Sequence, residues 1–207
     1  MSFRLDKIFN TFTASPFQQN SYIEIEPCEA LKPYIRCFWG SRASTAVIPP
    51  QNSSLVIPDI CMDIILTENN TEIYDCFCGI NNNSFTSRNN APLLFGIRFY
   101  AWSVPLFSDE NMNGTLNAFY DANAYFKDFN DSLKAEIMSC GSIYERKRIA
   151  EKYLISKLNQ SRENCDVMNS LFLIINYKGR ATVSDLSDYC IISKRQLEQR
   201  IVWYVTI

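Results

Sequence analysis

The sequence predicts an α+β protein in which an antiparallel β domain, barrel- or sandwich-like, is followed by helices. Two patterns carry this prediction. Apolar segments of strand length, separated by Pro, Gly and Asn clusters, recur from residue 21 to about residue 104. Beyond residue 113 the apolar residues recur at helical spacing instead. The 207 residues, of which 47% are hydrophobic, suffice for an ordinary packed core.

Six segments are predicted as strands. Residues 21–27 (SYIEIEP) alternate apolar with acidic side chains, which is typical of a strand with one face in water. The other five segments are rich in β-branched, aromatic and Cys residues: IRCFWGS, SSLVIP, CMDIILTE, IYDCFCGI and LLFGIRFYAWSV. The Asn-rich residues 68–72 and 81–92 supply turn chemistry, so we expect turns or surface loops there. A flexible loop over a pocket is the alternative for both segments.

Three longer helices are predicted after the strands. Residues 115–138 carry apolar and aromatic side chains at helical spacing. Residues 142–158 begin with Ser142 and Glu145 placed as a capping box. Residues 163–179 place apolar side chains on one face and end at a glycine, the residue favoured directly after a helix.

The chain therefore divides into an N-terminal β domain (residues 1–113), a helical connector (114–160) and a C-terminal helical part (161–207). Charge is distributed unevenly along it. Residues 1–143 hold nine basic and fifteen acidic side chains (net −6), whereas residues 144–207 hold eleven and seven (net +4). A basic C-terminal third indicates contact with nucleic acid.

Residues 180–205 predict two short helices joined by a turn. Thr182 is a natural N-cap for the first helix, with Asp185 at position N3. Ser193 caps the second helix and Gln196 stands at its N3 position, which makes a second capping box. This is the helix-turn-helix outline, whose second helix enters the major groove of DNA.

The predicted recognition helix, about residues 193–204, carries basic and amide side chains. Arg and Lys bond guanine edges or phosphates, Gln bonds adenine, and the free N–H groups at a helix start attract a phosphate. The candidate DNA-binding residues are Ser193, Lys194, Arg195, Gln196, Gln199 and Arg200. The alternative is an ordinary capped basic helix on a protein surface.

The run VSDLSDYCIISKRQLEQRI…YV resembles the first helix-turn-helix of the AraC-type (AraC/XylS) transcription regulators. The upstream part resembles an N-terminal domain found in front of such modules, through EIEPCEALKPYIRCFWG, LVIPDICMDIIL, FGIRFYAWSV and YERKRIAEKYLISKL. The likeness extends from about Tyr22 to the last residue. It implies a transcription regulator whose β domain senses a small-molecule effector or mediates homodimer formation, and whose C-terminal helices contact DNA.

Two departures from the family pattern bear on activity. Ile191 stands where the family has a turn glycine, and a β-branched residue at positive φ is strained. The family module also contains two helix-turn-helix units joined by a long helix, whereas this sequence ends after the first. Because phosphate contacts supply most of the affinity, we expect a truncated regulator that binds DNA weakly or not at all.

A ligand-sensing or dimerisation module that acts without DNA contact is the alternative function. The β domain has enough aromatic side chains to line an apolar pocket, and Arg98 is a candidate anchor for an anion. The candidate ligand-binding residues are Trp39, Arg98, Tyr100 and Trp102. The same aromatic residues also fit the core of a sheet.

An enzyme, a metal site and a cofactor are not expected. The chain has no histidine, which removes the usual general base, the common nucleophile pairs and most metal-ligand sets. Asp59 and Asp63 are the nearest approach to paired catalytic acids, and they share a face if both lie in one strand. The eight cysteines lie mostly in apolar contexts typical of core residues. Cys76 and Cys78 face the same side of a strand, so a zinc site there is the alternative.

The sequence also bears on location. It contains no run of eighteen apolar residues that would span a bilayer. Charged and polar residues interrupt its first twelve positions, where a signal peptide needs an apolar run. We therefore expect a cytoplasmic protein with no membrane partner.

Overall fold

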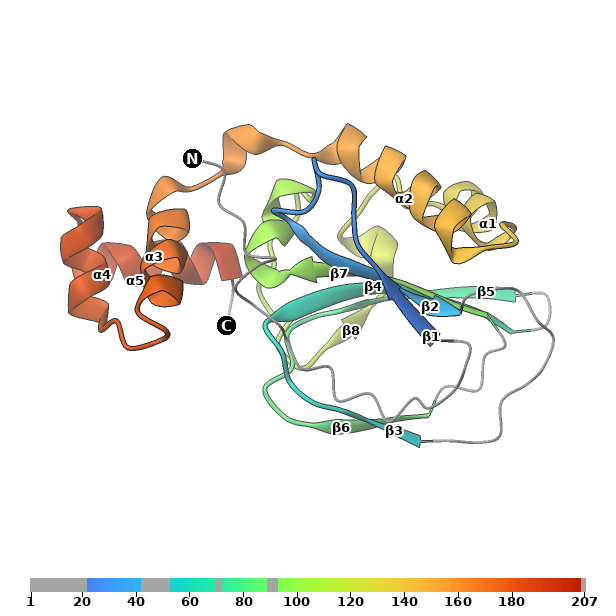
Figure 1. Ribbon diagram of the computed structural model, residues 1–207, viewed down its shortest axis with the longest axis horizontal. Coiled ribbons are helices and arrows are strands. Elements are labelled where there is room, and N and C mark those ends of the chain that lie inside the picture. The colour runs from blue at the N-terminus through green and yellow to red at the C-terminus, as the bar shows by residue number, and fades with distance from the viewer. Residues whose placement is uncertain (1–21, 42–52, 70–71, 89–92, 206–207) are drawn as a thin grey trace.

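The computed structural model describes residues 22–41, 53–69, 72–88 and 93–205. A six-stranded sheet lies at the centre, with helices over one face and at one end (Figure 1). The strands are β1 (Tyr22–Ile25), β2 (Ile35–Ser41), β3 (Ser53–Val56), β4 (Cys61–Asn69), β5 (Glu72–Cys78), β6 (Phe85–Arg88), β7 (Leu93–Tyr100) and β8 (Phe119–Tyr120). The helices are η2 (Ala101–Leu106), η3 (Ala122–Ala124), α1 (Asp131–Met138), α2 (Ile143–Lys157), η4 (Gln160–Arg162), α3 (Cys165–Asn176), α4 (Val183–Cys190) and α5 (Lys194–Val205). None of these described helices combines the length and apolarity needed to cross a bilayer.

The main sheet has the order β1-β2-β7-β4-β5-β8, and every neighbouring pair is antiparallel. The predicted α+β class is confirmed. The barrel-like form is wrong, because the sheet stays open with β1 and β8 as its edges. β8 offers only two residues for pairing, and helices rather than further strands cover one face. β3 and β6 form a separate antiparallel pair on the side opposite α1 and α2 (Figure 1).

The face of the sheet under the helices is apolar. The register pairs Met62 with Phe99 and Ile64 with Ile97, so these four buried side chains lie on one face. The helices add to the same core Ile137, Ile143, Ala150 and Leu154. The helices of the predicted connector, α1 and α2, thus close the hydrophobic core of the sheet.

The predicted capping box at the start of α2 is confirmed. The Ser142 N–H donates to the Glu145 carboxylate at 3.2 Å, and the Glu145 N–H donates to Ser142 Oγ at 3.3 Å. α1 begins similarly, since Asn130 Oδ1 accepts from the Leu133 N–H at 3.1 Å. These side chains satisfy backbone N–H groups that have no partner within the first turn, which is why the two helices begin at these residues.

The single helix predicted over residues 115–138 is wrong. This segment forms β8, the short η3 and, only from Asp131 onward, α1. Its aromatic side chains pack on the sheet: the rings of Tyr125 and Phe126 lie 4.8 and 5.4 Å from that of Phe77. Strand pairing and burial of these rings outweigh a local helical spacing. The β domain consequently extends past its predicted end at residue 113.

The loop predicted over residues 81–92 is also partly wrong, because it contains β6. This strand pairs with β3 along its whole length, and the Phe85 ring lies 5.7 Å from that of Phe119 in β8. A partner strand and an aromatic contact thus override the turn-forming composition. In the other predicted turn, residues 70–71 lie outside the described part of the chain.

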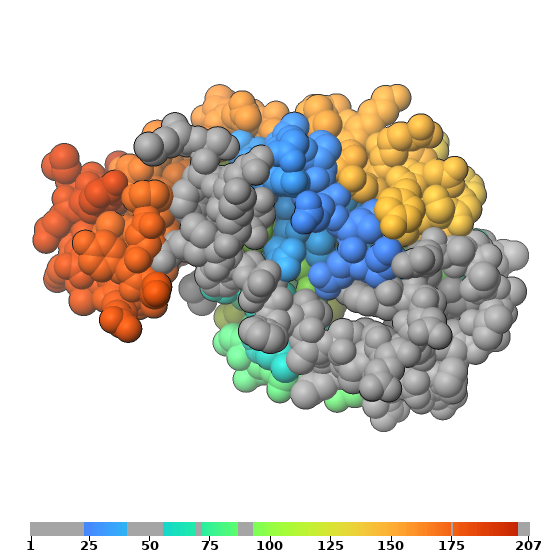
Figure 2. Space-filling view, in the orientation of Figure 1, coloured from blue at the N-terminus to red at the C-terminus, as the bar shows by residue number. Residues whose placement is uncertain are grey.

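The helices α3, α4 and α5 form a separate C-terminal unit, visible as the orange and red lobe at one end of the molecule in Figure 2. A small core of its own holds the unit together. Each helix contributes one buried leucine, namely Leu173, Leu186 and Leu197. The unit also packs on the β domain, since α5 contacts η2, while Val167 of α3 and Ile201 of α5 join the main core.

Both capping boxes predicted for this unit are present. At the start of α4 the Thr182 N–H donates to the Asp185 carboxylate at 2.7 Å. At the start of α5 the Ser193 N–H donates to Gln196 Oε1 at 3.0 Å. The arrangement of α4, a short turn and α5 is therefore the one that the sequence predicts.

Ile191, in the turn between α4 and α5, has the left-handed backbone conformation predicted for this position (φ 56°, ψ 41°). This region crowds the Cβ of any L-residue, and most of all that of a β-branched one. The side chain is 91% exposed, so it gains little packing in return. We expect Ile191→Gly to raise the free energy of unfolding of the C-terminal unit by about 1 kcal/mol in urea denaturation.

The matched control is Ile191→Ala, which removes the same exposed side chain but keeps the Cβ at positive φ. Its free energy of unfolding should rise much less than that of the glycine variant. Equal stabilisation by both variants would show that backbone strain is not the cause.

Candidate functional site

The first candidate site is the solvent-facing surface of α5. Ser193, Lys194, Arg195, Gln196 and Gln199 are all exposed there. The C-terminal end of α5 approaches η2, whereas its N-terminal end lies away from the sheet (Figure 1). Five of the six predicted DNA-binding residues are thus accessible at the free end of the helix.

Two of these residues also hold the start of α5. Gln196 Oε1 accepts from both the backbone N–H and the hydroxyl of Ser193, at 3.0 and 2.9 Å. The Gln196 N–H donates in return to Ser193 Oγ at 3.2 Å. Lys194 and Arg195 therefore supply the positive charge of the first turn, and Gln199 follows one turn later.

Arg200, the sixth predicted residue, lies differently. Its guanidinium forms an ion pair with Asp166 in the first turn of α3. It also borders, with Asn164, Gln196 and Gln199, a shallow cavity of about 350 Å³. The sequence offers no local signal for Asp166, because no periodicity or cap joins a residue of α3 to one of α5.

The second candidate site is a polar centre on the sheet face opposite α1 and α2, formed by Trp39, Asp59, Asp63 and Arg98. Arg98 Nε lies 3.0 Å from Asp63 Oδ1, and Arg98 Nη1 lies 3.6 Å from Asp59 Oδ2. Trp39 Nε1 donates to Asp63 Oδ1 at 2.8 Å, and its ring centroid is 5.7 Å from the guanidinium carbon. The strand order brings Trp39 of β2, Asp63 of β4 and Arg98 of β7 together, because β7 lies between β2 and β4.

Charge within the polar centre is unevenly matched. Burial raises the pKa of Asp59, although the nearby guanidinium opposes this. Burial lowers the pKa of Arg98, but the charges of Asp63 and Asp59 outweigh burial and raise it above its ordinary value. Two carboxylates thus already compensate the charge of Arg98, which weighs against the predicted role of this residue as an anion anchor.

The other two predicted ligand-binding residues lie where β7 passes into η2. The rings of Tyr100 and Trp102 stack with their centroids 6.5 Å apart, and the Tyr34 ring lies 5.9 Å from that of Trp102. Both residues are buried. The Trp102 indole N–H has no hydrogen-bond acceptor among the described residues. These rings therefore belong to the packing that joins the sheet to η2.

Four cysteines of the β domain, Cys37, Cys61, Cys76 and Cys78, lie near the charged side chains of the polar centre. Cys37 and Cys78 are buried, and burial raises the pKa of each thiol to about 12. The thiols are therefore neutral at physiological pH and poorly suited to nucleophilic chemistry. Within the part of the chain that the structure describes, no three His, Cys, Asp or Glu side chains are placed to hold a metal ion.

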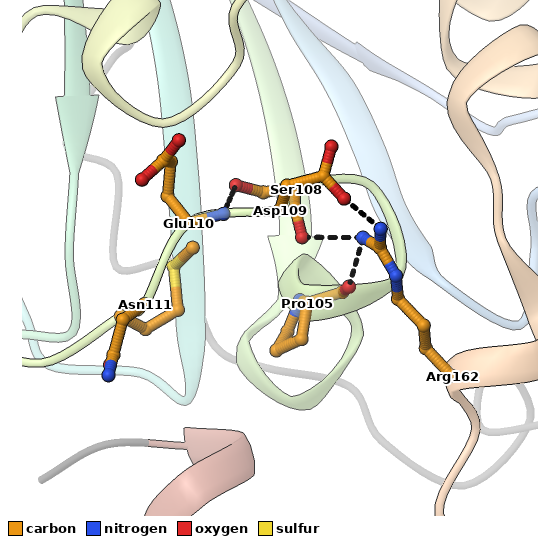
Figure 3. A pocket seen from close by; sticks show the side chains of 7 residues that line it. Pro105, Ser108, Asp109, Glu110, Asn111 and Arg162 are labelled. Atoms are coloured by element: carbon orange, nitrogen blue, oxygen red, sulfur yellow. Dashed lines mark hydrogen bonds and ion pairs between the residues drawn. The ribbon is translucent and has the colours of Figure 1, made fainter.

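A further hollow, of about 220 Å³, lies beside η2 (Figure 3). Arg162 forms one wall. Its Nη1 donates to the Pro105 carbonyl at 3.3 Å and to the Ser108 carbonyl at 2.7 Å, and its Nη2 pairs with Asp109. These contacts attach η4, which leads into α3, to the segment following β7. We assign this hollow a structural role at the junction of the two parts.

Comparison with known proteins identifies the N-terminal part of the chain. Residues 23–121 match the family model described as a domain of unknown function, DUF6597. The matched segment includes the polar centre and ends before α1, so α3, α4 and α5 lie outside it. No curated protein and no solved structure matches the chain.

Proposed function

We propose that this protein is a DNA-binding transcription regulator of the AraC type, in which α5 enters the major groove. The exposed, basic and capped N-terminal half of α5 is the observation that carries the proposal. The DUF6597 domain supports it, because in AraC-type regulators this is an N-terminal domain. The turn at Ile191 separates α4 from α5, as the turn of a helix-turn-helix separates its two helices.

Three exposed side chains of α5 have a definite chemical task in this proposal. Lys194 and Arg195 neutralise phosphates or bond guanine edges, and Gln199 reaches an adenine edge. Lys194 and Arg195 are the exposed basic side chains of α5, so this helix contacts few phosphates in the proposal. We expect affinity in the range of non-specific binding, with a Kd of about 10⁻⁴–10⁻⁶ M at physiological salt.

The test is fluorescence anisotropy of the protein with random duplex DNA at low and moderate salt. Binding should fall steeply as salt rises, because counterions are released from phosphates. Each replacement of Lys194 or Arg195 by alanine should make the negative slope of log K against log salt shallower by about 1, if each residue contacts one phosphate.

Lys152→Ala is the matched control, because it removes one positive charge from an exposed position on α2, within the β-domain part of the fold. Its salt slope should equal that of the unmodified protein. The proposal is wrong if the protein binds no DNA at low salt, or if the α2 variant loses as much slope as the α5 variants.

The polar centre favours a second candidate, a β domain that binds a small-molecule effector or forms a homodimer without DNA contact. Trp39 and Asp59 are only half-buried, so part of the centre is open to a ligand. A protein that binds no DNA, but whose unfolding temperature rises with a ligand or with its own concentration, would favour this candidate.

A further inference from the structure

We infer that Asp166 and Arg200 are a positioning pair that orients the recognition helix, and that Arg200 does not itself act on DNA. This inference rests on the proposed function and divides the predicted DNA-binding residues into two classes. Arg200 is the only one of the six whose charge is directed to a carboxylate of another helix in the described structure. Its test must therefore separate an effect on α5 from an effect on phosphate.

Contacts within α3 fix the position of Asp166 independently of Arg200. Asn164 Oδ1 accepts from the backbone N–H groups of Asp166 and Val167, at 3.0 and 3.3 Å, and so caps α3. The Asp166 carboxylate then stands in the first turn, where the helix dipole favours a negative charge. Its position is consequently set by α3, and the longer arginine side chain adapts to it.

The three helices of the unit meet at Asp166. Its carbonyl oxygen accepts from Ser170 Oγ at 2.7 Å, within α3, and from Cys190 Sγ at 3.5 Å, at the end of α4. Its carboxylate reaches Arg200 of α5. The residue thus ties the last residue of α4 and the middle of α5 to one point, on either side of the turn at Ile191.

Burial is uneven across the ion pair. The Asp166 side chain is 18% exposed, whereas that of Arg200 is 41% exposed. Loss of Arg200 would therefore leave a largely buried carboxylate without a partner, which costs more than leaving the guanidinium unpaired, because water can solvate the guanidinium. The aspartate next to Arg200 also repels a phosphate that would approach the same guanidinium.

The two roles for Arg200 predict opposite results for Asp166→Asn. If Arg200 contacted DNA directly, removing Asp166 would release the guanidinium and tighten binding. If the pair positions α5, both Asp166→Asn and Arg200→Gln should weaken binding to duplex DNA by about threefold to fivefold, the size of a partly exposed ion pair. The salt slope should stay unchanged, because no phosphate contact is lost.

A charge swap provides a partial rescue. The double variant Asp166→Arg with Arg200→Asp restores the ion pair in the opposite sense. We expect it to recover only part of the lost affinity, because the helix dipole disfavours a cation in the first turn of α3. Asp188→Asn is the matched control, because it removes one negative charge from an exposed position of α4 in the same unit. It should not weaken binding.

Hydrogen–deuterium exchange of the α5 amides supplies a second readout that needs no DNA. Exchange should quicken in Asp166→Asn and in Arg200→Gln, and slow again in the swapped variant. The inference is overturned by tighter DNA binding of Asp166→Asn, by a salt slope that falls by about 1 in Arg200→Gln, or by unchanged exchange in α5. Absence of DNA binding in every variant, together with the expected exchange, would remove the proposed function and leave the positioning pair.

Discussion

Replacing Arg98 by alanine is expected to lower the free energy of unfolding by about 3–5 kcal/mol at neutral pH. Arg98 is buried and pairs with both Asp63 and Asp59. Without it, the two carboxylates remain close together without the guanidinium between them, while Trp39 continues to donate to Asp63. Urea denaturation, followed by tryptophan fluorescence, measures the loss.

The loss of unfolding free energy in Arg98→Ala should depend on pH. Burial already raises the pKa of Asp59, and the guanidinium opposes that rise. In Arg98→Ala the pKa of Asp59 should rise further. A carboxyl whose folded-state pKa is raised contributes stability that is present below its unfolded pKa and lost as pH rises through its folded pKa. The difference in unfolding free energy between Arg98→Ala and the unmodified protein should therefore become smaller as pH falls from about 7 to about 5.

Two further variants make this result specific. Arg148→Ala removes an exposed arginine of α2 and should change stability by no more than about 0.5 kcal/mol. Adding Asp59→Asn and Asp63→Asn to Arg98→Ala removes the unpaired charges and should recover part of the loss. A loss of less than about 1 kcal/mol from Arg98→Ala would contradict the account of the polar centre as a buried, mutually dependent set.

Replacing Leu197 by alanine should unfold the C-terminal unit while the sheet remains folded. Leu197 is 1% exposed, and Leu173 and Leu186 are the other buried members of the small core among the described residues of this unit. Truncation of a buried leucine costs about 2–5 kcal/mol, which is a large fraction of the stability of a three-helix unit. Hydrogen exchange should show lost protection in α3, α4 and α5, with protection retained in β4 and β7. Binding to DNA should be lost with it.

Val202→Ala is the control on the same helix. This side chain is 47% exposed, so its truncation should cost no more than about 0.5 kcal/mol. If Leu197→Ala behaves like Val202→Ala, the three leucines do not hold the unit together. If it unfolds the sheet as well, the two parts fold as one cooperative body through the contact of α5 with η2.

Features that depend on near neighbours in the chain were predictable. The segment IRCFWGS coincides with β2, and the capping boxes at Ser142, Thr182 and Ser193 form as their spacing indicates. The positive φ of Ile191 was implied by the resemblance to a family that has glycine at this position of the turn. The capping boxes involve residues only three positions apart, and the composition of residues 35–41 alone indicates a strand, although its hydrogen bonds go to β1 and β7.

The sequence by itself therefore determined the α+β class, most strands and the two capped helices α4 and α5 with the turn between them. Only the tertiary structure decided that the sheet stays open, that residues 115–138 divide into β8, η3 and α1, and which charges meet. Arg98 joins Asp63 because β7 and β4 are neighbours, and Arg200 joins Asp166 because α5 packs on α3. Such contacts connect distant residues, and the burial of the whole core, not a local spacing, selects them.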